Sequence, residues 1–247
     1  MNEERSSLER PGEDVRSRIE SVVRGAGAVL FGVADLAHGN LEALSRAGDV
    51  SLAGLTTGIS YGWRLSDIVV DGIGAYPTRS YQYHYRQVNQ MLDHIGLRVA
   101  ALIQEAGKRV FPVPSSQILD WNAYRGHISH KAVARLAGLG WIGKSNLLVN
   151  PVYGSRVRYA TVLTDLSLPF GRAMEGTCGA CVRCVTACPG GAIGDDPAAF
   201  DLEKCVETID RLRRQENIGS KICGICVRAC PGRSKPGCPV IPPDVGP

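Results

Sequence analysis

The cysteines are the residues of this 247-residue chain whose type and spacing point most clearly to chemistry. All 9 lie in the last third of the sequence. The first run reads Cys178-x2-Cys181-x2-Cys184-x3-Cys188, and a proline follows it. This is the bacterial ferredoxin spacing for a 4Fe–4S cluster, in which the fourth cysteine ligates the other cluster of a pair. The run therefore predicts two clusters.

A second run, Cys223-x2-Cys226-x3-Cys230, lacks one cysteine of the full pattern, and Cys205 lies upstream as its replacement. Counting ligands gives two sets of four, each with thiolates from both runs. Cluster one takes Cys178, Cys181, Cys184 and Cys230, and cluster two takes Cys188, Cys205, Cys223 and Cys226. Cys238 is left over, and it could displace Cys205 from cluster two.

Structural zinc is the alternative, because Cys-x2-Cys pairs also ligate a tetrahedral ion. Zinc sites use two such pairs and have no use for a third cysteine followed by x3-Cys-Pro. Disulfides are disfavoured, since the charged N-terminus lacks the apolar stretch of a secretory signal. No apolar run approaches the length of a membrane span, so a cytoplasmic chain is expected. Clusters held wholly by thiolates leave no position for substrate, and their expected role is electron transfer.

The elements that must position this module lie in a body without cysteines. We divide the chain into an α/β body, residues 1–172, and a double-cluster module, residues 173–247. Apolar periodicity predicts helices at 15–25, 85–106, 129–137 and 202–214, with strands near 28–37 and 156–166. Helices alternating with few strands favour an α/β or α+β sandwich. The net charge of +4 does not indicate a nucleic-acid partner.

A glycine-rich segment follows the third of these helices. It runs from Gly138 to Ser145 as GLGWIGKS, but its spacing is not that of a phosphate-binding loop. Its three glycines fit either a plain helix–strand turn or a close approach of the backbone to a bulky ligand, and the residues leave both open. His127 and His130 have helical spacing just upstream. No carboxylate or cysteine lies near them in sequence, so a metal-binding histidine pair is not expected.

The ordered combination of HISHKAVARLAGLGWIGKSNLL, CGACVRCVTACPGGAI, Cys205 and ICGICVRACPG resembles the cobalamin-dependent epoxyqueuosine reductases, relatives of the reductive dehalogenases. The resemblance implies a nitroreductase-like sandwich that binds cobalamin, followed by a ferredoxin-like double-cluster module. The two clusters would feed single electrons to cobalt. The cobalamin contacts that it implies are Tyr83, His84, Gly140, Trp141, Gly143 and Lys144.

The chain departs from this family in two respects. The acidic proton donor expected before the glycine segment is missing from YRGHISHK, so Tyr124, His127 or Tyr83 is expected to supply the proton. The sequence also stops after the second cysteine run, where family members that modify tRNA carry a helical-repeat domain. From position 172 on it holds ten basic and nine acidic residues, which offers no basic surface instead.

These features predict an oxidoreductase with two 4Fe–4S clusters and cobalamin, served by a low-potential donor such as ferredoxin or flavodoxin. A small-molecule substrate is expected in preference to tRNA. Two other functions stay open. One is a ferredoxin-type electron carrier or corrinoid-reducing partner without its own substrate, and the other is epoxyqueuosine reduction on tRNA.

Overall fold

A four-stranded antiparallel sheet forms the centre of the molecule, in the order β1-β2-β6-β3. The computed structural model describes residues 11–37, 40–45 and 48–232. The strands are β1 (Leu30–Asp35), β2 (Thr57–Arg64), β3 (Val110–Val113) and β6 (Val157–Thr164), and a separate hairpin pairs β4 (Trp141–Ile142) with β5 (Leu148–Val149). The expected mixed class is confirmed, and the antiparallel pairing makes it α+β.

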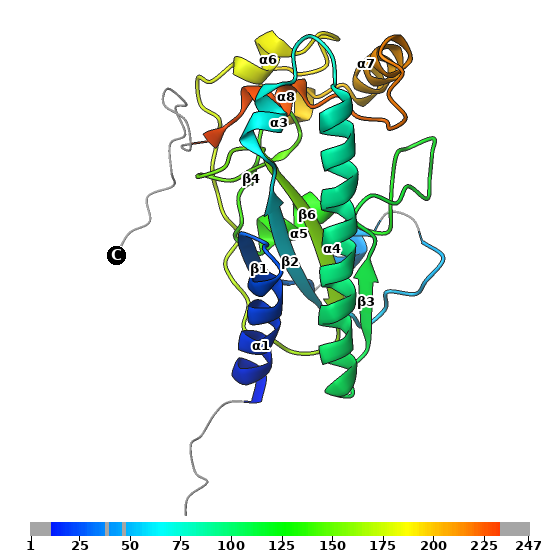
Figure 1. Cartoon of the computed structure of the whole chain (residues 1–247). Coiled ribbons are helices and arrows are strands. Elements are labelled where there is room, and N and C mark those ends of the chain that lie inside the picture. The colour runs from blue at the N-terminus through cyan, green and yellow to red at the C-terminus, as the bar shows by residue number, and fades with distance from the viewer. Residues whose placement is uncertain (1–10, 38–39, 46–47, 233–247) are drawn as a thin grey trace, which may run out of the picture.

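Helices cover both faces of the sheet. On one face lie α1 (Pro11–Gly25) and α4 (Arg79–Glu105), in front of the strands in Figure 1, and on the other lies α5 (His130–Leu136). The long α4 buries Val88, Leu92 and Ile95 at the spacing of one helix face. It begins after Thr78, whose side chain accepts a hydrogen bond from the Tyr81 N–H and caps the helix. Short helices α2 (Asn40–Leu44) and α3 (Asp67–Asp71) complete the body.

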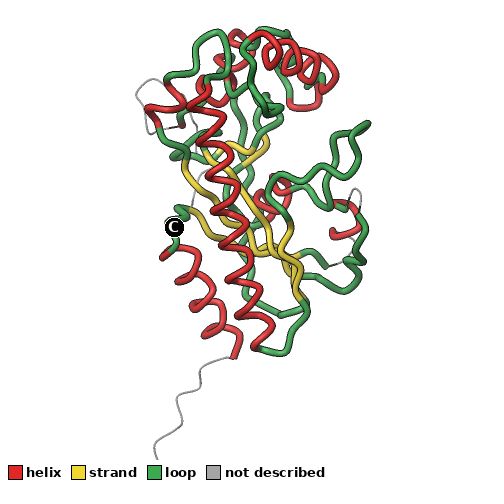
Figure 2. The backbone as a smooth tube through the Cα atoms, turned by 45° about the vertical axis from the view of Figure 1, so that its right-hand side comes forward, coloured by secondary structure: helices red, strands yellow, loops and turns green. Residues whose placement is uncertain are grey.

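The cysteine module occupies one end of the molecule, where α4 begins (Figures 1 and 2). It consists of α6 (Arg183–Ala187), the 3-10 turn η1 (Pro197–Ala199), α7 (Leu202–Gln215) and α8 (Ile225–Ala229). Its buried residues Leu212, Ile218 and Ile225 belong to the same apolar core as α1 and α4. One core therefore runs across the boundary expected at residue 172.

The edge of β6 is covered over only half its length. β3 pairs with Thr161–Thr164, and the chain leaves the sheet after Val113. Within the described ranges, the first half of β6, residues 157–160, therefore has no strand beside it on that side. Side chains from both faces of β6 can reach this gap, and the gap positions the cavity described below.

Most of the helices expected from sequence are present with small shifts at their ends. The long helix starts at Arg79, six residues before the expected start, and α7 carries Cys205 as expected. Strands β2 and β3 and the β4–β5 hairpin were not expected. Within the described residues, no helix combines the length and apolar character needed to cross a membrane.

Candidate functional site

Four cysteine side chains from three separate segments gather between α6, α7 and α8. Burial raises the pKa of the Cys205 thiol to about 11, and the thiols of Cys223 and Cys188 add to the rise. Burial also raises the pKa of Cys226, with Cys223 and Cys205 as the next contributors. Such effects decay with distance, so these four thiols lie close together. We call Cys188, Cys205, Cys223 and Cys226 the inner group.

The other run gathers beside it. Burial raises the pKa of Cys184, and the neighbouring thiols of Cys178 and Cys181 add to the rise. We call Cys178, Cys181, Cys184 and Cys230 the outer group. The thiol of Cys184 also contributes to the raised pKa of Cys226, so the two groups adjoin. The expected ligand sets remain predictions, although the fold brings together all four cysteines of the inner set and three of the outer.

None of the eight described cysteines forms a disulfide. Among the residues that the structure describes, no three His, Cys, Asp or Glu side chains converge tightly enough to hold one metal ion. Ligands of a single zinc ion must meet at a point, whereas thiolates of a 4Fe–4S cluster stand apart around a larger body. The donor set is all sulfur, and eight described cysteines are the number that two clusters need. The residues fit iron–sulfur clusters.

Close backbone packing holds the cysteine runs in place. A Cβ at Gly190 would lie 1.9 Å from Thr208 Oγ1, so only glycine lets the turn after Cys188 press against α7, one turn beyond Cys205. A Cβ at Gly154 would lie 2.1 Å from the carbonyl oxygen of Cys230. The N–H of Ser155 donates to that same oxygen at 3.0 Å. These contacts fix the module on the body.

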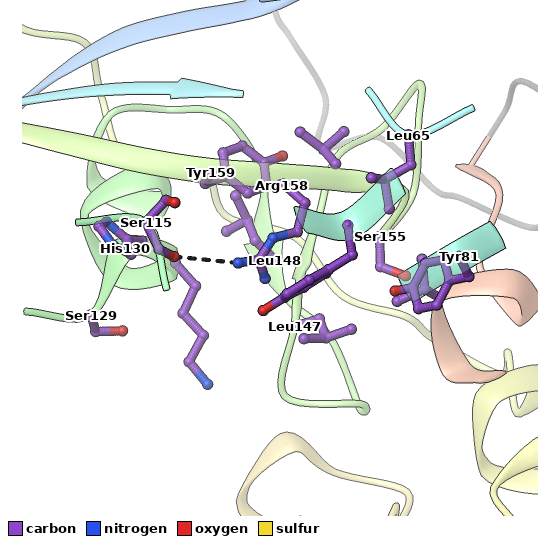
Figure 3. A pocket seen from close by; sticks show the side chains of 14 residues that line it. Leu65, Tyr81, Ser115, Ser129, His130, Leu147, Leu148, Ser155, Arg158 and Tyr159 are labelled. Carbon is purple, nitrogen blue, oxygen red and sulfur yellow. Dashed lines mark hydrogen bonds between the residues drawn. The ribbon is translucent and has the colours of Figure 1, made fainter. Parts of the chain in front are cut away.

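Beside the inner group lies a cavity of about 270 Å³ at the uncovered edge of β6 (Figure 3). It is lined by Leu65, Tyr81, Tyr85, Ser115, Ser129, His130, Lys131, Leu147, Leu148, Ser155, Val157, Arg158, Tyr159 and Val227. Val227 follows Cys226 directly, so α8 of the cysteine module supplies part of the wall. A second cavity, of about 500 Å³, shares Tyr85 with the first and has Trp121 and Lys221 in its lining.

Tyr81 connects the cavity with the inner group. Its ring is so close to the backbone between Cys223 and Cys226 that a Cβ at Gly224 would lie 2.5 Å from the ring. Burial raises its pKa, which the charge of Arg158 lowers and the thiols of Cys226 and Cys223 raise further. The same side chain lines the cavity. One aromatic ring therefore separates the inner cysteines from whatever occupies the cavity.

The polar groups of the cavity come from several elements, and two of them, His130 and Lys131, lie in the first turn of α5. His130 donates from Nε2 to the Pro114 carbonyl at 3.1 Å, because a carbonyl only accepts, and its Nδ1 accepts from the Thr161 hydroxyl at 2.9 Å. Burial lowers the pKa of His130 to about 4, so the ring is neutral. Burial likewise lowers the pKa of Lys131 to about 8.

Arg158 stands at the centre of the cavity wall. Its guanidinium lies 4.4 Å from the centre of the Tyr85 ring and donates to the side-chain oxygen of Asn89 at 3.0 and 3.1 Å. The dashed line in Figure 3 marks its bond to the Ser115 carbonyl, at 3.3 Å. These contacts hold a cation at the wall in one orientation.

The residues expected from sequence are not the ones that line the cavity. On α4, Tyr81 and Tyr85 face it, one helical turn apart, whereas Tyr83 is 64% exposed. His84 accepts a hydrogen bond from the Ser66 N–H at 3.0 Å, which holds the start of α3. The helical period turns the Tyr83 side chain to solvent and away from this cavity, and its expected role as a proton donor stays a prediction.

The other two expected proton donors also lie elsewhere. Tyr124 has a left-handed backbone (φ 52°), and its hydroxyl accepts from Lys221 Nζ at 3.0 Å outside the cavity. His127 is buried on the α5 side of the sheet, with Phe111 against its ring and Asp49 Oδ1 3.5 Å from its Nε2. His130, which sequence reasoning singled out only as half of an improbable metal pair, does line the cavity.

Internal packing accounts for the glycine-rich segment. Gly138 adopts φ +77° to end α5. A Cβ at Gly140 would lie 2.3 Å from the Val149 carbonyl oxygen, and one at Gly143 would lie 2.6 Å from the Val149 side chain and 3.2 Å from Cys178 Sγ. Trp141 is 2% exposed and Lys144 pairs with Asp195 at 3.7 Å. The segment supports the β4–β5 hairpin and the outer group, and its residues do not line the cavity.

A corrinoid does not fit the cavity as it stands. Pockets for drug-sized ligands already measure about 300–1,000 Å³, and a corrinoid is larger than such ligands. The residues that the resemblance assigned to cobalamin do not meet at one site. Tyr83 faces solvent, His84 holds the start of α3, and the other four lie in or beside the β4–β5 hairpin. The cysteines are therefore suited to iron–sulfur clusters, whereas the described part of the structure has no cavity that matches cobalamin.

Comparisons with known proteins place the chain. No family profile matches it. An epoxyqueuosine reductase of Xanthomonas campestris is 30% identical over 260 residues, covering 88% of this chain and 70% of that protein. That of Bacillus cereus is 31% identical over 114 residues, covering 43% of this chain and 30% of that protein. Several matches thus reach only about a third of the relative's length.

Solved structures agree on the fold. A catabolic reductive dehalogenase superimposes with a TM-score of 0.70 at 20% identity, over 91% of this chain and 32% of that one. Another reductive dehalogenase, with a TM-score of 0.68 at 19% identity over 93% of this chain and 33% of that one, is described as suggesting a mechanism for B12-dependent dehalogenation. Epoxyqueuosine reductase from Streptococcus thermophilus gives 0.57 at 19% identity, over 93% of this chain and 69% of that one. With the fold shared and the identity extending over most of both sequences in the Xanthomonas match, the chain belongs to the epoxyqueuosine reductase family.

Proposed function

We propose that the chain is an iron–sulfur reductase that passes single electrons through two 4Fe–4S clusters to an acceptor in the cavity beside the inner group. The observation that carries the proposal is Tyr81, whose ring touches the backbone between two inner cysteines and also lines the cavity. A ferredoxin module packed on a body with its own cavity keeps the electrons away from water until they reach the acceptor.

The cavity residues have roles in the reduction. Arg158 and Lys131 stabilise negative charge as it develops on the acceptor. Lys131 is the group best placed to release a proton near neutral pH, because burial lowers its pKa to about 8. His130 stays neutral and keeps its proton on Nε2, where it bonds to the Pro114 carbonyl. Leu147, Leu148 and Val157 give the cavity an apolar wall.

Cobalamin is the acceptor that the family relation favours, and the size of the cavity argues against it. A corrinoid would supply a cobalt centre suited to single-electron chemistry. Binding one here requires the two cavities on either side of Tyr85 to join. The cytoplasm and a ferredoxin or flavodoxin donor belong to the same proposal. A substrate on tRNA is not favoured, because the cavity is small and closed by aliphatic and aromatic side chains.

An anaerobic titration tests the proposal. The chain is reconstituted with iron and sulfide, reduced, and mixed with hydroxocobalamin or with candidate small acceptors. Absorption and electron paramagnetic resonance (EPR) spectra then report the clusters and the cobalt separately. Reduced clusters that reoxidise with a bound acceptor support a reductase, and a base-off cobalt(II) signal identifies cobalamin as that acceptor.

Two results contradict the proposal. A protein that takes up zinc in place of about four irons per cysteine group has no clusters to carry electrons. A protein whose reduced clusters pass electrons to external ferredoxin, but whose cavity binds no acceptor, is an electron carrier. Replacing Tyr81 by leucine should slow electron transfer from the inner group to an acceptor in the cavity. It should leave unchanged the exchange of electrons at the outer group, where the residues between the cysteines are exposed.

A further inference from the structure

We propose that the cavity beside the inner group binds a small organic anion, a carboxylate or phenolate attached to an apolar body. This inference names the substrate class of the reductase proposed above. The anion is a substrate only if that proposed function holds. The binding itself depends only on the residues that line the cavity.

Two cations line the cavity and no carboxylate does. Arg158 and Lys131 both contribute to its wall, and the lining contains neither aspartate nor glutamate. The neighbouring Asp93 lines the second cavity instead, where it accepts a hydrogen bond from the Ser115 N–H at 2.8 Å. The partners of both cations are neutral: Asn146 for Lys131, and Asn89 with the Ser115 carbonyl for Arg158. Their positive charge is therefore balanced by no acid of the lining.

Two buried hydroxyl groups in the lining lack partners. Ser155 Oγ and Tyr159 Oη are both buried and make no hydrogen bond in the described structure. Each such group costs free energy unless a ligand or water bonds to it. Hydroxyls can donate to an anion, and both are labelled in Figure 3 beside Arg158 and Leu65. Gly62, opposite Tyr159 on β2, leaves room for the ring, since a Cβ there would lie 3.0 Å from it.

The rest of the wall fits an apolar body. Leu65, Leu147, Leu148, Val157 and Val227 line the cavity together with the rings of Tyr81 and Tyr85. A volume of about 270 Å³ accommodates a single substituted ring and excludes a nucleoside on a polynucleotide chain. Cations that recognise phosphate on a macromolecule would be found at the surface, whereas these lie among aliphatic side chains.

The test measures binding to the iron–sulfur-loaded full chain by anaerobic calorimetry. Benzoate is the probe, benzamide is its uncharged match, and inorganic phosphate is the competitor. We expect benzoate to bind about tenfold to a hundredfold more tightly than benzamide, as one charge-assisted bond implies. Phosphate should not displace it, because phosphate lacks the apolar body.

Variants localise the effect. Lys131→Gln should abolish most of the preference for benzoate, while Lys108→Gln, the same change at an exposed lysine, should leave it intact. Tyr159→Phe removes an unbonded hydroxyl without changing shape, so it should fold normally and bind benzoate several-fold more weakly.

Equal affinities for benzoate and benzamide, or displacement by phosphate as effective as by benzoate, would overturn the proposal. So would a preference that survives Lys131→Gln. EPR spectra of the reduced sample are recorded in parallel. Loss of cluster signals with benzoate binding intact would contradict the proposed reductase alone, and normal clusters without benzoate binding would contradict the anion site alone.

Discussion

The two cysteine groups differ in what surrounds them. In the outer run the residues between the cysteines are exposed, among them Gly179, Ala180 and Arg183. In the inner run the corresponding Gly224, Ile225 and Val227 are buried against the body. Each group holds one cysteine from the other run in the expected ligand sets, so similar sequence motifs sit in unlike surroundings.

This difference gives the module a direction. A donor protein can approach the outer group, where the chain between ligands is open to solvent. The inner group lies against Tyr81 and the cavity, and its four cysteines are half-buried. In the proposed function, electrons would enter at the outer cluster and leave from the inner one toward an acceptor in the cavity.

Removing one ligand from each group has the largest expected effect. Cys184→Ala and Cys226→Ala should each lose about four irons per chain, because a cubane with three protein ligands is not retained. Cys226→Ala should also destabilise the body, since α8 belongs to the common core. Iron assay and thermal unfolding check both. Unchanged iron in Cys184→Ala would contradict the ligand sets.

A matched pair of variants settles which cysteine completes the inner cluster. Cys205→Ala should lose about four irons, and Cys238→Ala, which lies outside the described residues, should lose none. If the two outcomes are exchanged, Cys238 is the ligand and the position of Cys205 in the inner group is incidental.

The contact between the inner group and the body predicts a stability difference on one helix. Tyr81→Ala should lower the free energy of unfolding by about 3–5 kcal/mol, as large-to-small changes at buried aromatic rings do. Tyr83→Ala, two residues away and exposed, should change it by about 0.5 kcal/mol or less. Denaturant unfolding of the loaded protein measures both. Equal losses would mean that Tyr81 is not the buried link.

The buried His130, which lines the cavity beside the inner group, predicts that the free energy of unfolding falls at acid pH. Its pKa is about 4 in the folded chain and near 6.5 when unfolded, so the unfolded state binds more protons between these values. Stability should fall as pH drops from 6.5 to 4, by about 3 kcal/mol in total. A His130→Gln variant should lack this component, and an identical pH slope in both proteins would argue against a buried neutral ring.

Lys131 predicts a smaller effect in the alkaline range. With a pKa of about 8, its charge is present below that pH and is lost above it. Affinity for benzoate should be constant up to pH 8 and then fall by about tenfold per pH unit. His130 is already neutral, and burial keeps Tyr81 and Tyr159 protonated in this range. Affinity independent of pH between 7 and 9 would exclude Lys131 from the site.

Sequence spacing indicated the cysteine groups, because several ligands of one cluster lie close along the chain and the ferredoxin pattern takes a further one from the other run. The cavity was not predictable in this way. It exists because β3 stops at Val113, and nothing in the local sequence marks where a partner strand ends. Arg158 lies in a strand whose alternating pattern predicts only a face, and Lys131 lies in the first turn of a short helix.

The choice of residues on α4 failed for a simpler reason. The segment YQYHY was interpreted by its resemblance to a family element, which points to Tyr83 and His84. The helix cap at Thr78 shows that this segment is already helical. Continuing the apolar face of Val88 and Leu92 backward by helical turns would have selected Tyr85 and Tyr81. The signal was present in the sequence, at the expected start, Tyr85, and four residues before it, at Tyr81.

The most direct test of the central claim is an anaerobic assay of iron and acid-labile sulfide combined with EPR of the reduced protein. The account predicts about eight irons and eight sulfides per chain and two magnetically interacting cluster signals, because the groups adjoin. Cys226→Ala should leave only the signal of the outer cluster. One cluster, or zinc in place of iron, would contradict it.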